Sequence, residues 1–207
     1  ERIFERANSK YKKALEIKPN FKEAKYNLGG NLPFLAKLKT GMEAEDLYRQ
    51  AIDIYKEALE LYGDNYDILH NWADVLLVVA YTKSGKDAEK LYQEACEKFN
   101  DALQVKPNSK NSLYGFGSAL YELAKNKSDL VAEKYYRKAI EKLLLAHELG
   151  SGSYNLACCY SLINDKKMAL KYLDMSLERN EVIIGHVLQD QDWKGYLEDE
   201  GFKAIIS

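Results

Sequence analysis

Residues 85–107 read GKDAEKLYQEACEKFNDALQVKP, and this stretch recurs along the chain with a period of 44 residues, as at Ala44, Ala88 and Ala132. The copy that starts at Ala44 reads AEDLYRQAIDIYKEALELYG, and the copy that starts at Ala132 reads AEKYYRKAIEKLLLAHELG. A shorter copy, FERANSKYKKALEIKP, starts at Phe4. The copies share alanines at two positions, which are Ala7, Ala51, Ala95 and Ala139, and Ala14, Ala58, Ala102 and Ala146. Because a repeated helical hairpin covers its apolar face only by stacking on its neighbours, this period predicts an α-solenoid.

The composition allows a large core and excludes a general attraction to polyanions. Apolar residues make up 46% of the chain, and 30 Lys and Arg residues nearly balance 32 Asp and Glu residues. A nearly neutral chain has no broad positive field, so we expect no nucleic-acid partner. The longest apolar run, Val75–Tyr81, is too short to span a bilayer, so we expect no direct membrane insertion.

The three cysteines favour a reducing compartment. Cys158 and Cys159 are adjacent and Cys96 is distant, which makes a poor disulfide framework. We therefore expect the cytoplasm or the soluble compartment of an organelle. Because the chain opens at Glu1 without a methionine, the sequence leaves open whether a targeting segment or a first helix precedes it.

Helical periodicity, prolines and glycines predict a series of helices joined by short turns. The expected helices cover residues 1–18, 22–39, 42–62, 66–83, 86–105, 110–126 and 129–149. Pro33 lies inside the second helix, so we expect a kink or a local break there. Thr40, Ser84 and Ser128 are placed to cap the long helices; Glu43 would complete a capping box with Thr40, and Asp87 would form an approximate one with Ser84.

Within each hairpin, large and small residues alternate between the two helices in a recognisable way. The first helices carry a large residue followed by a small one, in Leu28-Gly29, Trp72-Ala73 and Phe116-Gly117. The second helices carry a small–aromatic–small pattern, in Ala51, Tyr55 and Ala58 and again in Ala95, Phe99 and Ala102. This pattern resembles the tetratricopeptide repeat, whose usual length is roughly 34 residues. The extra residues fall around the hairpin turn and lengthen both helices, as in repeats similar to those of the plant-type mitochondrial import receptor and of some organellar assembly factors.

The resemblance implies an all-α fold, a right-handed α-solenoid of stacked antiparallel helix pairs with a C-terminal capping segment. We expect one array over residues 1–189 and a cap over 190–207. The array divides into a half repeat (1–20), extended repeats (21–64, 65–108 and 109–150), an ordinary repeat (151–180) and a following helix (181–189). In the cap, DQDWKGYLEDEGFKAII, six side chains would cover the end of the stack: Trp193, Tyr196, Leu197, Phe202, Ile205 and Ile206.

Catalytic groups do not converge anywhere in the sequence. His70, His147 and His186 are scattered, and no nucleophile motif surrounds them. His147 takes the repeat position of a core leucine, and we interpret Cys158 and Cys159 as small buried packing residues, since no second Cys or His pair stands at ligand spacing. We therefore expect no enzyme activity, no catalytic residues, no cofactor and no metal.

The first helices place asparagines at a shared offset. Asn27, Asn71 and Asn155 directly precede the large residue of their helix, while the fourth repeat has Gly115 there. An amide side chain both donates to and accepts from a peptide bond, so spaced asparagines can hold an extended chain. Aromatic residues precede these positions, and the resemblance implies that this surface lines the inner groove. The predicted groove residues are Tyr26, Asn27, His70, Asn71, Asp74, Tyr114, Ser118, Tyr154 and Asn155. The alternative is that these residues form an ordinary polar helix face.

The charges at the predicted groove positions indicate which kind of ligand the groove can bind. Tetratricopeptide repeats that bind chaperones hold a C-terminal carboxylate with Lys and Arg, but here the equivalent positions are neutral or acidic: Glu23, Tyr26, Asn27, Asp67 and Asp74. We expect a protein or peptide ligand that is basic or amphipathic rather than a free acidic C-terminus, bound by a monomer. The sequence thus predicts a non-catalytic interaction scaffold or adaptor. The alternatives are an organellar import or assembly receptor, and the regulatory repeat region of a larger enzyme.

Overall fold

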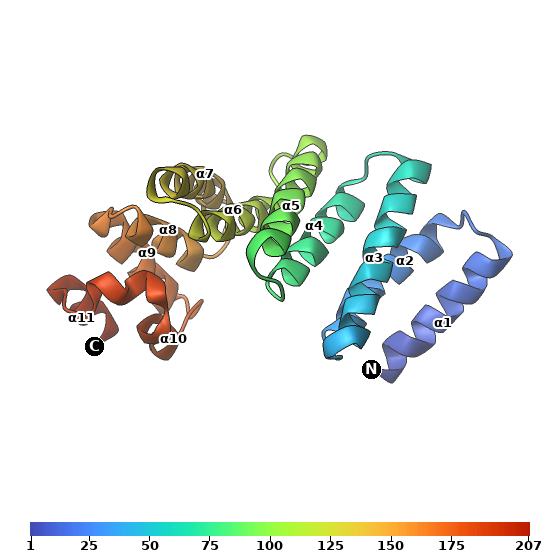
Figure 1. The fold of residues 1–207 in the computed structure, drawn as a ribbon, viewed down its shortest axis with the longest axis horizontal. Coiled ribbons are helices and arrows are strands. Elements are labelled where there is room, and N and C mark those ends of the chain that lie inside the picture. Colours follow the sequence, from blue (N-terminus) through green and yellow to red (C-terminus); the bar gives the residue numbers. More distant parts are fainter. The chain divides into compact units, whose positions relative to one another are not determined.

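The structure, a computed structural model, describes residues 1–207 as helices and turns without strands (Figure 1). The first unit, Glu1–Pro107, contains α1 (Arg2–Ile17), α2 (Lys22–Ala36), α3 (Gly41–Tyr62), α4 (Tyr66–Ala80) and α5 (Gly85–Val105). The second unit, Asn108–Ser207, contains α6 (Lys110–Lys125), α7 (Asp129–Glu148), α8 (Tyr154–Leu162), α9 (Lys166–Glu178), α10 (Ile184–Gln189), the 3-10 helix η1 (Gln191–Tyr196) and α11 (Glu200–Ile206). None of these helices is both long enough and apolar enough to cross a membrane.

Each unit is built from helical hairpins that pack on one another. In the first unit, α2 pairs with α3 and α4 pairs with α5, while α1 packs on α2 and α3 on α4. In the second unit, α6 pairs with α7, α8 pairs with α9, and α7 packs on α8. The expected all-α fold of stacked helix pairs is confirmed, and the seven predicted helices agree with the structure to within three residues at each end.

The extra length of the repeats is shared between the two helices of a pair. The long second helices α3, α5 and α7 have 22, 21 and 20 residues, whereas α9 has 13. The first helices α4 and α6 have 15 and 16 residues, whereas α8 has nine.

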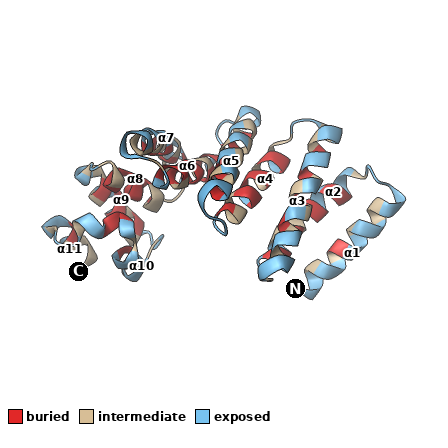
Figure 2. Cartoon of the chain, viewed as in Figure 1, coloured by how far each residue is buried: buried red, intermediate tan, exposed pale blue.

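The repeated alanines lie where the two helices of a pair come closest. Ala51, Ala95 and Ala139 are completely buried, and each long helix carries buried residues on part of its surface only (Figure 2). Gly117 shows how tight the contact is, because a Cβ built on it would lie 2.5 Å from Cγ of Leu143. Small residues at these positions are therefore a requirement of packing.

We expected a kink or a local break at Pro33; the local break is wrong, because α2 runs through Pro33 as one helix from Lys22 to Ala36. Proline removes the amide that the carbonyl oxygen of Gly29 would otherwise accept from within the helix. The hydroxyl of Tyr55 on α3 donates to that oxygen instead. The neighbouring helix thus satisfies the acceptor that the proline leaves open.

The expected side-chain caps on the long helices are also wrong. Thr40, Ser84 and Ser128 make no capping hydrogen bond, and Glu43 pairs with Lys39 at 2.9 Å. The first residues of α3 and α5 are Gly41 and Gly85. Both have φ 58°, which lies outside the right-handed helical region. This start differs from the geometry in which a cap side chain reaches the first amides. Side-chain caps occur on other helices, for example at Asn65 and Ser109.

The tail packs against the last hairpin. Trp193 and Phe202 are completely buried and their rings stack with centroids 5.6 Å apart. Of the other expected cap residues, Tyr196, Ile205 and Ile206 are half-buried, but Leu197 is exposed. The helix expected over residues 181–189 is shorter in the structure, where α10 covers only Ile184–Gln189. The Asn180 backbone, at φ 56°, ends the preceding helix, and extended backbone precedes α10.

Candidate functional site

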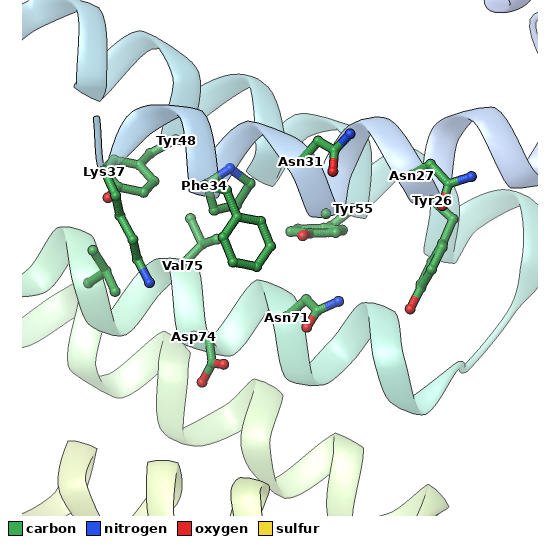
Figure 3. A pocket seen from close by; sticks show the side chains of 13 residues that line it. Tyr26, Asn27, Asn31, Phe34, Lys37, Tyr48, Tyr55, Asn71, Asp74 and Val75 are labelled. Carbon is green, nitrogen blue, oxygen red and sulfur yellow. The ribbon is translucent and has the colours of Figure 1, made fainter. Parts of the chain in front are cut away.

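A hollow of about 300 Å³ opens between α2 and α4 of the first unit, with α3 contributing to its lining. Its residues are Tyr26, Asn27, Gly30, Asn31, Pro33, Phe34 and Lys37 from α2 and the residue that follows it, Tyr48 and Tyr55 from α3, and Asn71, Asp74, Val75 and Val78 from α4. Tyr26 and Asn27 lie at one end, Lys37 and Tyr48 lie at the other, and Phe34 stands between them (Figure 3). We call this hollow the α2/α4 groove.

The α2/α4 groove combines amide groups with an apolar floor. Asn27, Asn31 and Asn71 present three side-chain amides from its two sides (Figure 3). Asn27 is exposed, and Asn31 and Asn71 are half-buried. Each amide carries both donors and an acceptor, so the groove can bond peptide groups without reading a particular sequence.

One acidic and one basic group lie in the groove. Partial burial raises the pKa of the Asp74 carboxyl above its ordinary value, and the charges of His70 and Lys37 oppose that rise. The Asp74 side chain is still 51% exposed, so its carboxylate is accessible to a ligand. Burial likewise raises the pKa of the Tyr26 and Tyr55 hydroxyls, which therefore remain protonated at neutral pH.

His70 does not line the α2/α4 groove. Its ring stacks on Tyr66 with centroids 5.6 Å apart, and its Nε2 lies 3.4 Å from Oδ2 of Asp74. His70 therefore contacts Asp74 without lining the groove itself. The row of aromatic residues expected along the groove is interrupted at this position.

The predicted groove residues of the second unit lie near one another but bond internally. Asn155 Nδ2 donates to Ser118 Oγ at 2.9 Å, and Ser118 Oγ donates to the carbonyl oxygen of Tyr114 at 2.9 Å. The Tyr154 hydroxyl donates to Oδ2 of Asp190 in the tail at 2.8 Å. Asn155 thus shares a sequence offset with Asn27 but has a bonding partner within the chain.

Comparisons with known proteins agree on the fold. YrrB, "a TPR protein with an unusual peptide-binding site", matches with 21% identity and a TM-score of 0.62, covering 86% of this chain and 78% of that one. A MamA double mutant matches with 20% identity and a TM-score of 0.65, covering 86% of each chain. A thermophilic TPR protein of Thermus thermophilus matches with 18% identity and a TM-score of 0.58, covering 84% of this chain and 82% of that one. The chain therefore has the TPR-type helical-repeat fold.

Part of the sequence is similar to a family of receptors. The family model of the plant-specific mitochondrial import receptor subunit TOM20 matches residues 63–155, which is less than half of this chain. Among curated proteins, the comparison of sequences gave no match.

Asn31, Phe34 and Lys37 of the α2/α4 groove are among the lining residues that the sequence analysis did not predict. They follow Asn27 by about one, two and three helical turns, so the helical period of Asn27 was the signal that could have found them. The contribution of Tyr48 and Tyr55 had no such signal, because it depends on how α3 packs against α2.

A cluster near the C-terminal tail contains the only group of residues with the spacing of metal ligands. The potential ligand atoms of Cys158, Asp190 and Asp192 all lie within 4.8 Å of one another. The two carboxylates already accept hydrogen bonds, from Tyr154 and Tyr121 respectively. Burial raises the pKa of the Cys158 thiol well above its usual range, which keeps the thiol protonated. The arrangement fits a hydrogen-bonded fastening of the tail better than a metal centre.

His147 and Cys159 occupy packing positions, as the sequence predicted. The His147 ring lies edge-on to Tyr172 with centroids 5.4 Å apart, and its Nδ1 is 3.1 Å from Ser153 Oγ. Cys159 is completely buried. Neither residue lies among the groups that line the α2/α4 groove.

Proposed function

We propose that this protein is a non-catalytic interaction scaffold that binds a segment of a partner protein in the α2/α4 groove. The observation that carries the proposal is the meeting of three asparagine amides, an apolar floor and an accessible carboxylate in one hollow. The amides bond the ligand backbone, while Phe34, Val75 and Val78 contact its apolar side chains.

The ligand's charge follows from Asp74. A Lys or Arg of the ligand beside this carboxylate gains a charge-assisted hydrogen bond. A free C-terminal carboxylate is repelled by Asp74 and has only Lys37 to attract it in the groove. The proposed ligand is therefore a basic or amphipathic segment.

A second candidate is an import or assembly receptor, in which the bound segment is a targeting signal. The match of residues 63–155 to the plant TOM20 family supports this candidate. In both cases the activity is binding, so the two differ in the identity of the partner and not in the chemistry of the groove.

The test begins with affinity capture of partners, followed by mapping of the bound segment with synthetic peptides. Asn27→Ala combined with Asn71→Ala removes two amides, each worth about 0.5–1.5 kcal/mol as a net hydrogen-bond contribution. We expect peptide affinity to fall about ten- to a hundredfold while the melting temperature stays unchanged.

The matched control is Asn100→Ala, which removes an exposed amide on α5 outside the groove and should leave affinity unchanged. Asp74→Lys tests the role of charge separately. This variant should lower the affinity for a basic peptide more than the affinity for the same peptide with its Lys and Arg replaced by Gln. Equal affinity of the folded double variant and the parent protein would refute binding in the α2/α4 groove.

A further inference from the structure

An open slot lies on the face of α2 that lines the α2/α4 groove. Tyr26, Gly30 and Phe34 follow one another at four-residue spacing, so they share one face of the helix. All three line the groove, and a Cβ built on Gly30 would meet no atom within 4 Å. The two aromatic side chains start about 12 Å apart along the helix axis, which leaves room for a ligand side chain between them. We call this opening between Tyr26 and Phe34 the Gly30 slot.

The two ends of the Gly30 slot are aromatic and accessible. Tyr26 is 38% exposed and Phe34 is 55% exposed. Phe4 stacks on the Phe34 ring with centroids 5.9 Å apart, and this contact supports the ring while leaving more than half of the residue exposed. The Nζ of Lys37 lies 5.9 Å from the centroid of the same ring, so Phe34 already borders a cation. Both ends of the slot therefore offer a surface against which a cation can lie.

The α4 side of the slot is polar and negatively charged. Asn71 and Asp74 project from α4 across from the residues of α2, and Tyr55 lies between the two helices (Figure 3). The Asp74 side chain is 51% exposed, so its carboxylate is accessible from the slot. Burial, and after it the charges of Tyr26 and Asp74, raise the pKa of the Tyr55 hydroxyl. The ionisable neighbours of this hydroxyl are thus acidic groups, which attract a cation.

These surroundings discriminate between the possible side chains of a ligand. An apolar side chain would bury the Asp74 carboxylate without a partner, which is costly. A lysine ammonium is a compact, strongly hydrated point charge that does not stack on a ring. A guanidinium is planar, stacks on aromatic rings and carries five donors. It can therefore bond the carboxylate of Asp74 and the amide oxygen of Asn71 while it lies against an aromatic side chain.

We infer that the Gly30 slot recognises an arginine side chain of the bound segment in preference to lysine. This preference builds on the proposed function, because it identifies the side chain that the α2/α4 groove selects. The guanidinium enters between Tyr26 and Phe34, pairs with Asp74 and donates to Asn71. Gly30 is then a specificity-determining residue, since a larger residue at this position would fill the space that the arginine needs.

The probes are blocked amino acids and blocked pentapeptides. Nα-acetyl-arginine amide, its lysine counterpart and its uncharged citrulline counterpart are titrated against the whole protein, and NMR follows the backbone amide of Gly30 and the side-chain amide of Asn71. We expect arginine to shift both signals and to bind about threefold or more tightly than lysine, while citrulline binds more weakly than either. The pentapeptide Gly-Ser-Arg-Ser-Gly and its version with lysine should show the same preference at higher affinity, because the groove also bonds their backbone.

Variants of the slot separate binding from stability. Gly30→Leu fills the slot and should lower arginine affinity about tenfold or more, whereas its melting temperature should not fall, because leucine is the better helix former and its Cβ meets no neighbour. Its matched control, Asn100→Leu at an exposed position of α5, should leave affinity unchanged. Asp74→Asn keeps the shape but removes the charge, so arginine should lose its advantage over citrulline. Tyr26→Leu and Phe34→Leu should each lower arginine affinity about two- to fivefold.

Several results would overturn the arginine preference. These are an unshifted Gly30 amide at tens of millimolar arginine probe, equal affinity for the arginine and lysine pentapeptides, or equal binding by the folded Gly30→Leu variant and the parent protein.

Asn27→Ala distinguishes this preference from the proposed function, because Asn27 lines the groove but is not part of the slot. If the variant weakens both pentapeptides and the parent protein binds them equally, the proposed function stands and the arginine preference is wrong. If the variant weakens neither pentapeptide and arginine is still preferred, the slot binds arginine without the backbone contact that the proposed function assigns to Asn27.

Discussion

The Tyr55 hydroxyl oxygen lies 2.8 Å from the carbonyl oxygen of Gly29, to which it donates a hydrogen bond. Gly29 stands four residues before Pro33, so its carbonyl would otherwise lack a helical donor. Tyr55 is 1% exposed, and its ring occupies the space beside the glycine. The Tyr55 side chain of α3 therefore donates a hydrogen bond to a carbonyl oxygen of α2 and also packs against that helix. The same side chain lines the α2/α4 groove.

Tyr55→Phe should destabilise the protein by about 1–3 kcal/mol, because a buried carbonyl oxygen loses its partner. Urea denaturation measures the change. Tyr62→Phe is the matched control, since the Tyr62 hydroxyl donates to the Asn20 carbonyl at an exposed position and its loss should cost less.

Pro33→Ala separates the hydrogen bond from the packing of the ring. Alanine restores the amide that Gly29 can accept within the helix, so Tyr55→Phe should cost less in the Pro33→Ala background than in the parent. Identical costs in both backgrounds would show that the hydroxyl does not compensate for the proline.

Gly29→Ala should destabilise the first unit by about 1–3 kcal/mol through overpacking, since the added Cβ would lie 2.8 Å from the Tyr55 ring. The neighbouring Gly30→Ala meets no atom within 4 Å and should stabilise α2 by up to about 1 kcal/mol through helix propensity. Thermal unfolding of the two variants should shift the melting temperature in opposite directions. Shifts of equal sign and size would contradict the close approach at residue 29.

Trp193→Ala should cost about 3–5 kcal/mol, because it leaves a cavity at a fully buried position between the tail and the last hairpin. Lys194→Ala, at an exposed position in the same turn, is the control and should change stability little. Deleting residues 193–207 should expose the apolar face of the last hairpin and promote association, measured by sedimentation. An equally stable monomeric truncation would exclude a capping role.

Asp192→Asn should change how stability depends on pH. Burial raises the pKa of the Asp192 carboxyl above its ordinary value of 3.8, while the hydrogen bond from Tyr121 and the charge of Lys125 oppose the rise. The folded state thus holds the proton more tightly than the unfolded state, so this group's contribution to stability falls as pH rises from acid toward neutral. Asparagine does not titrate and still accepts from Tyr121, so the variant should gain stability relative to the parent at neutral pH and lose that advantage near pH 4.

Asp199→Asn should change the pH dependence of stability in the opposite direction. Its hydrogen bonds from Lys166 and from the Phe202 amide hold the pKa of the Asp199 carboxyl below the ordinary value. Its contribution to stability is therefore present at neutral pH and is lost as pH falls. Parallel denaturation curves of the two variants across this range would contradict the assigned shifts.

The sequence by itself determined the helices and their pairing. Alanine at residues 51, 95 and 139 and the large–small dipeptides before them recur with the period of the hairpin, and period and residue size are local properties of the chain. Tyr26, Asn27, Asn71 and Asp74, which the sequence analysis predicted for a ligand groove, line the hollow between α2 and α4, and ligand binding there stays a prediction. The repeat pattern did not reveal that α2 continues through Pro33, or that the carbonyl oxygen of Gly29 accepts a hydrogen bond from Tyr55, 22 positions after the proline.

Only the tertiary structure distinguished residues that the repeat makes equivalent. Asn27 and Asn155 share one offset, yet Asn27 is exposed in the α2/α4 groove while Asn155 donates to Ser118. Helix type and facing direction follow from neighbours along the chain, whereas burial and hydrogen bonding depend on groups that folding brings within a few ångströms from distant positions.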